Sequence, residues 1–149
     1  MLLGSLAYDI ALSIREAQVY GLSVRQFDSE FQIGYGVHFS DAGSYIFFVD
    51  QNADRQYMEA DDDIVRQYTL GRGHSIVRFC GRGPAIEHCS DTAAITTLDV
   101  VFFRPDPDAI MSSDIFEGYS EAEIVVRSQA GDLRTVRVAS TGQISVQNP

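Results

Sequence analysis

The residues best suited to chemistry lie in an acid-rich stretch between two strand-like segments. Oxygen-bearing side chains follow one another along Asp50-Gln51-Asn52-Ala53-Asp54, with Asp61 further on. Calcium takes roughly six to eight oxygen ligands, so Asp50, Asn52, Asp54 and Asp61 form a candidate calcium site. It is not an EF-hand, because Arg55 stands where that loop needs glycine and Asp61 where it needs glutamate. The alternative, which we prefer, is a turn whose side chains cap their own backbone.

The two cysteines, Cys80 and Cys89, are separated by a short stretch that contains two glycines and a proline. We expect them to form a disulfide that closes this loop if the protein is exported, the alternative being a reduced pair in a cytosolic protein. His88 and His74 lie nearby in the sequence. Their spacing contains neither a CxxC nor an HxxxH pattern, so we do not expect a structural zinc site.

The sequence contains no arrangement typical of catalysis. The many carboxylates are expected to lie in polar loops, and none is placed by the sequence beside an apolar pocket that would raise its pKa. The serines lie in turns and lack a GxSxG pattern. The glycines of LGRGHS and CGRGP precede no helix, which leaves a phosphate-binding loop unsupported. We therefore expect a protein that is not an enzyme.

Length and composition predict a single globular domain over residues 1–149. The chain is 45% hydrophobic, which is enough for a core, and its nine Phe and seven Tyr suit a sheet-rich fold. The formal net charge of −10 repels phosphate backbones and anionic lipid. We see no signal peptide and no apolar run long enough to span a membrane.

An amphipathic helix is predicted at the N-terminus, over Leu3–Tyr20. Apolar residues recur there every three or four positions, which places them on one helical face. Those expected to pack or assemble are Leu3, Leu6, Ala7, Ile10, Ile14 and Ala17. Because no capping residue precedes this pattern, we expect that Met1 was added for expression and that the native helix continues upstream.

The remainder of the chain reads as strands and loops. Period-two alternation or apolar runs predict strands over 31–39, 45–49, 64–70, 74–80, 96–104, 122–128, 133–139 and 143–147. Two polar loops, 50–63 and 105–119, are expected to be exposed and irregular. A helix over 1–24 followed by a β-rich part over 31–149 predicts an α+β fold, in which a long N-terminal helix packs on antiparallel sheet.

Several segments, in order, resemble the type IV pilins and the type II secretion pseudopilins. They are LAYDIALSIREAQVYGLSVR, YIFFVDQNADRQY, IVRQYTL and EIVVRSQAGDLRTVRVASTGQISV. The most similar group is that of the FimT- and GspH-like minor subunits. The resemblance covers nearly the whole chain from Leu6 onward. We expect that family's leader peptide, processing site and hydrophobic first half-helix to precede the sequence printed here.

The resemblance implies a filament subunit that has no catalytic apparatus. Its expected partners are other pilin or pseudopilin subunits, the filament assembly machinery, and the inner membrane through the upstream segment. The expected location is an extracytoplasmic filament, at the cell surface or in the periplasm, with a precursor in the cytoplasmic membrane. No cofactor is implied other than Ca²⁺, which some pseudopilins bind. A free-standing secreted binding or adhesin-like module, with or without calcium, is the alternative.

The resemblance also raises DNA binding, for which the FimT-like branch is known. The weak candidates here are Arg127, Arg134 and Arg137 on the last strands. Arg134 and Arg137 are an odd number of residues apart and should therefore point to opposite faces. The residues after Gly142 also lack the Gly-Arg-x-Arg pattern expected of DNA-binding members. We therefore expect these arginines to pair with neighbouring carboxylates and not to bind nucleic acid.

Overall fold

The structure is a computed structural model that describes residues 3–22, 34–40, 42–50, 57, 63–70, 73–103, 108–128 and 130–147. The predicted α+β fold built on a long N-terminal helix is wrong. The described part of the chain is mostly β: its strands form two antiparallel sheets of five strands each, and a single α-helix accompanies them. Two strands that sequence reading missed, at 87–89 and 110–113, lengthen the two sheets.

The first sheet has the strand order β3-β2-β1-β6-β7. Its strands are β1 (Gly34–Phe39), β2 (Ser44–Asp50), β3 (Asp63–Thr69), β6 (Leu98–Phe102) and β7 (Ile110–Ser113). Strand β1 is the middle strand and pairs with both β2 and β6. Its alternating residues Tyr35, Val37 and Phe39 pack on the core. A Cβ at Gly36 would come within 2.7 Å of the Val100 carbonyl oxygen, so the glycine is needed for the close approach of β1 and β6.

The second sheet has the order β10-β9-β8-β4-β5. Its strands are β4 (Ser75–Arg82), β5 (Glu87–Cys89), β8 (Glu121–Arg127), β9 (Leu133–Ala139) and β10 (Ile144–Gln147). A short 3-10 helix, η1 (Ser90–Thr92), follows β5. The meander β8-β9-β10 turns at Gly131 and Gly142, both of which have a positive φ that suits glycine.

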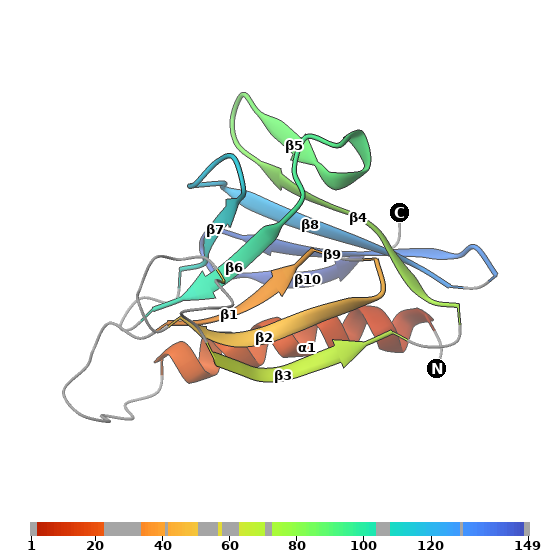
Figure 1. Ribbon diagram of the computed structural model, residues 1–149, viewed down its shortest axis with the longest axis horizontal. Coiled ribbons are helices and arrows are strands. Elements are labelled where there is room, and N and C mark those ends of the chain that lie inside the picture. Colours follow the sequence, from red (N-terminus) through yellow and green to blue (C-terminus); the bar gives the residue numbers. More distant parts are fainter. Residues whose placement is uncertain are drawn as a thin grey trace.

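Helix α1 (Leu3–Leu22) packs against both sheets (Figure 1). It contacts β1 and β6 of the first sheet and β8, β9 and β10 of the second. The helix therefore completes a core that the inner faces of the two sheets also line. Its buried contributors, Ala7, Ile10, Ile14 and Ala17, are all 0% exposed. The side chains of Leu3 and Leu6 lie outside the described residues.

Candidate functional site

Helix α1 carries apolar side chains both on the face that is buried against the sheets and on the opposite, exposed face. Opposite the buried face, Tyr8 is 64% exposed, Leu12 60% and Val19 55%. Together with the exposed Arg15 they follow one another at spacings of four, three and four residues, which places them in one line along the helix. We call Tyr8, Leu12, Arg15 and Val19 the outer stripe. An exposed apolar stripe on a helix whose other face is already buried indicates an interaction surface.

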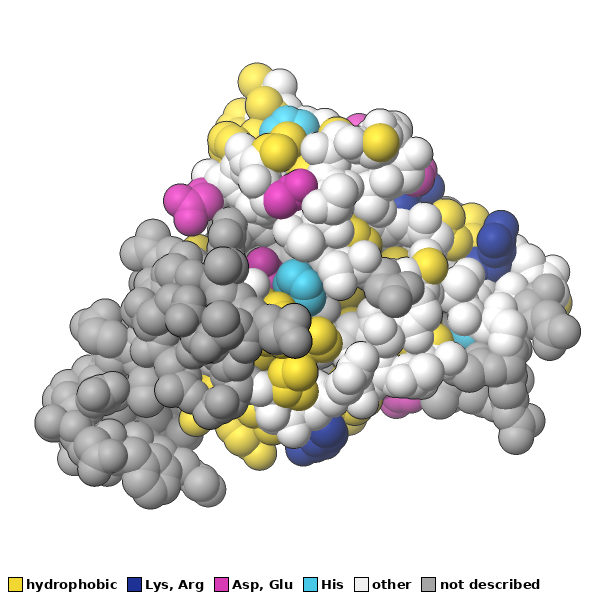
Figure 2. All heavy atoms as spheres, viewed as in Figure 1, with side chains coloured by type: hydrophobic (Ala, Val, Ile, Leu, Met, Phe, Trp, Pro, Cys, Tyr) yellow, Lys and Arg dark blue, Asp and Glu magenta, His cyan; other side chains and the backbone are white. Residues whose placement is uncertain are grey.

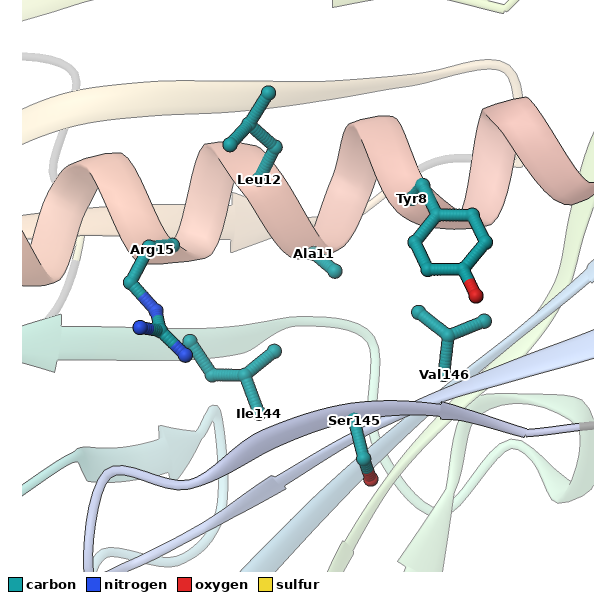
Figure 3. Close-up of a pocket in the computed structure, with 7 residues that line it drawn as sticks. All are labelled: Tyr8, Ala11, Leu12, Arg15, Ile144, Ser145 and Val146. Atoms are coloured by element: carbon teal, nitrogen blue, oxygen red, sulfur yellow. The ribbon is translucent and has the colours of Figure 1, made fainter.

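A groove of about 360 Å³ runs between the outer stripe and strand β10 (Figure 3). It is lined by Tyr8, Ala11, Leu12, Arg15, Ile144, Ser145 and Val146. Figure 3 shows Tyr8 reaching toward Val146 and Arg15 toward Ile144, while Ser145 points away from the helix. We call this the helix–strand groove. Its walls are apolar except at Arg15 and Ser145, so it is suited to apolar side chains accompanied by a negative charge.

The other flank of α1 is tied to the first sheet by polar and aromatic contacts. Ser13 Oγ lies 3.2 Å from Tyr45 Oη, and Glu16 lies 3.9 Å from Arg66 of β3. Burial raises the pKa of Tyr45 to about 12, although the hydrogen bond with Ser13 acts to lower this pKa. The Tyr20 ring packs edge-on against the ring of Phe47. These contacts fix the rotation of the helix, and hence the direction in which the outer stripe points.

A buried His38–Asp99 pair lies on the side of the first sheet that faces away from α1. His38 Nδ1 is 2.5 Å from Asp99 Oδ1, and the two residues are 7% and 2% exposed. They sit opposite each other on β1 and β6, and the Tyr57 ring packs beside His38. Sequence reading missed this pair. The available signal was an aspartate within the apolar run TTLDVVFFR, since a charge in a buried strand needs a partner.

A second polar cluster joins β5, β7 and the segment that follows β7. Tyr119 Oη lies 2.7 Å from His88 Nδ1 and 2.8 Å from Ser113 Oγ. Burial raises the pKa of Tyr119, although the Ser113 hydrogen bond acts in the opposite direction. Ser113 Oγ also accepts hydrogen bonds from two backbone amides, at Ile115 and Phe116. Ser113 therefore caps a turn. His88 is hydrogen-bonded to Tyr119 within this cluster.

Arg134 and Arg137, two of the candidates for nucleic-acid binding, lie on opposite faces of β9 in the structure. Arg137 pairs with Glu121 and with Glu123 Oε2, the latter at 2.9 Å. Arg134 points to the opposite face of β9 and donates a hydrogen bond from Nη1 to the Leu133 carbonyl. In Figure 2 the arginine side chains, drawn in dark blue, are dispersed and form no basic patch on the face in view.

The expectation that the carboxylates lie in polar loops is wrong for Asp50, Asp99 and Glu123, which are 0%, 2% and 3% exposed within strands. Glu123 on β8 accepts two hydrogen bonds of 3.0 Å from Arg82. Burial alone would raise the Glu123 pKa, but Arg82 and Arg137 together hold it below its usual range. The alternation of acidic and apolar residues in EAEIVVR could have indicated this outward-facing row.

The predicted calcium site lies largely outside the described residues. Asp50 ends β2 and is buried, while Asn52, Asp54 and Asp61 are among the residues that the structure does not describe. Elsewhere in the described ranges, no three His, Cys, Asp or Glu side chains are grouped so as to hold a metal ion. The two cysteines are joined as a disulfide between β4 and β5.

Comparison with protein-family models, curated proteins and solved structures finds no match to this chain. Of the helical residues that the structure describes, none belong to a segment with both the length and the apolar character of a membrane span. Of the described surfaces, the outer stripe with its helix–strand groove is the best candidate for a binding site. It exposes apolar side chains on a molecule whose net charge is −10.

Proposed function

We propose that this chain is a structural subunit of an extracytoplasmic filament, of the type IV pilin-like or pseudopilin-like kind. The subunit associates with others of its kind through the outer stripe of α1 and displays the sheets on the filament surface. The observation that carries the proposal is the exposure of Tyr8, Leu12 and Val19 on one line of a helix whose opposite face is fully buried. The sequence resemblance described above supports the same role.

The physical reason is the cost of leaving this stripe in water. Burying a Leu or Val side chain such as those of Leu12 and Val19 contributes about 1.5–3 kcal/mol relative to full exposure. A neighbouring copy that covers the stripe recovers part of that free energy. The net charge of −10 opposes close approach, and salt near physiological strength screens charges separated by more than about 8 Å. Association is therefore expected to be stronger in salt than in dilute buffer.

The proposal is tested by sedimentation equilibrium over a wide range of protein concentration. We expect the wild type to self-associate reversibly and Leu12→Glu to weaken association about 30-fold, because a charge placed in an apolar contact costs about 2 kcal/mol. Ile115→Glu is the matched control, since Ile115 is 57% exposed, follows β7 and is not part of the helix–strand groove. A wild type that stays monomeric at every concentration would contradict the proposal and favour the free-standing binding module.

A further inference from the structure

The two sheets have edge strands, and their protection differs. The outer edge of β7 is covered by the segment that follows it: Ser112 bridges to Glu117, and the amides of Gly118 and Tyr119 donate to the Met111 carbonyl. Strand β5 is only three residues long and carries a disulfide to β4. Coverage and shortness are the usual means by which proteins prevent edge strands from pairing with other chains.

Among the described residues, strands β3 and β10 have neither a covering segment nor a disulfide, although β10 is only four residues long. Each is the last strand of its sheet, and within the part of the chain that the structure describes no strand pairs with its outer edge. Strand β3 exposes two apolar side chains, Ile64 at 46% and Val65 at 37%. Strand β10 presents Ile144 and Val146 to the helix–strand groove. Both edges thus combine apolar side chains with a backbone edge that no strand of the described residues pairs with.

The charges along α1 differ between these two edges. Arg15 lies on the β10 side, where it lines the helix–strand groove. Glu16 lies on the β3 side, where it contacts Arg66. Asp9 precedes Glu16 by seven residues and so shares its flank. The β3 side thus carries two carboxylates, Asp9 and Glu16, against one arginine, Arg66, and the β10 side carries Arg15. The excess of one negative charge makes the β3 side of one molecule complementary to the β10 side of another.

We propose that β3 of one copy of this chain pairs with β10 of the next, so that the two sheets join across the contact. The inference rests on the proposed filament role and names the partner surface. In this arrangement Ile64 or Val65 enters the helix–strand groove, and Arg15 faces the carboxylates of the neighbouring helix. Because the two surfaces differ, the contact is head-to-tail, and repetition generates an open chain of subunits in place of a closed dimer.

Cysteine cross-linking tests the pairing. Gln67→Cys places a thiol on exposed β3 and Ser145→Cys one on β10, and the described native cysteines are already paired. A short bis-maleimide reagent is added to each variant alone and to their mixture. We expect about tenfold more covalent dimer in the mixture than in either single sample, because held proximity raises the effective concentration of the two thiols. Gln67→Cys mixed with Ile115→Cys is the control and should stay near background.

Charge variants add a second measurement. Arg15→Glu is expected to weaken self-association about fivefold, and Asp9→Lys combined with Arg15→Glu to restore it, since the flanks remain complementary. Cross-linking of Ser145→Cys with itself, or no rescue by the double variant, would overturn the head-to-tail contact. If Leu12→Glu weakens association but no cross-link forms between residues 67 and 145, this inference is overturned and the filament proposal stands. A monomeric wild type would overturn both.

Discussion

Replacing Glu123 by glutamine tests the electrostatics of the second sheet. Glu123 is 3% exposed and accepts hydrogen bonds from Arg82 at 3.0 Å, with an Arg137 nitrogen at 2.9 Å. Glutamine keeps the shape but removes the charge that balances these guanidinium groups. Breaking a fully buried pair costs about 3–5 kcal/mol. The arginine side chains are 27% and 38% exposed and keep Glu121 as a partner, so we expect a smaller loss, about 2–3 kcal/mol.

Urea unfolding at neutral and acidic pH measures this loss. The Glu123 pKa is lowered in the folded protein, so its contribution is present above its ordinary value of 4.5 and is lost as pH falls further. The wild type and Glu123→Gln should therefore differ at pH 7 and converge in acid. Glu117→Gln, at an exposed position, is the control and should change stability by less than about 0.5 kcal/mol. Equal stability of wild type and Glu123→Gln at pH 7, or a gap that persists in acid, would refute the reasoning.

Three further predictions concern the core, the polar cluster and calcium. Ile14→Ala should destabilise the folded chain by about 3 kcal/mol, because Ile14 is 0% exposed. Leu12→Ala should cost under about 0.5 kcal/mol in the dilute monomer. Similar losses for the two variants in thermal unfolding would contradict the assigned faces of α1. Tyr119→Phe removes an oxygen with two hydrogen-bond partners and should cost about 1–2 kcal/mol, which a chemical denaturation curve unchanged from wild type would disprove. The melting temperature should not move with millimolar calcium or EDTA, and a calcium-dependent rise would instead support a site at Asp50.

The strands were largely predictable from the sequence because local pattern determines them. Leu133–Ala139 matches its predicted strand, and the others shift by a few residues at their ends. The fold class was wrong because periodicity identifies an amphipathic helix but not how much sheet surrounds it. Ile110–Ser113 lacks an alternating pattern, and it forms a strand because β6 offers a neighbouring edge. Such tertiary pairing cannot be read from a four-residue segment.

The candidate site was only half predictable. Helical periodicity identified the inward residues of α1, and the structure buries Ala7, Ile10, Ile14 and Ala17. The outward apolar residues were visible in the sequence, but their meaning depends on β10, which is more than a hundred residues away and forms the second wall of the groove. The His38–Asp99 pair depends likewise on the register of β1 against β6. Contacts between distant strands need the topology as well as the sequence.

Hydroxyl-radical footprinting at low and high protein concentration tests the central claim most directly, because it reports the solvent exposure of individual side chains. Tyr8 and Leu12 are 64% and 60% exposed in the single chain, and Ile115 is 57% exposed on another surface. If the outer stripe mediates assembly, oxidation of Tyr8 and Leu12 falls as concentration rises while that of Ile115 stays constant. Unchanged oxidation of Tyr8 and Leu12 in a sample shown to be associated would contradict assembly through α1.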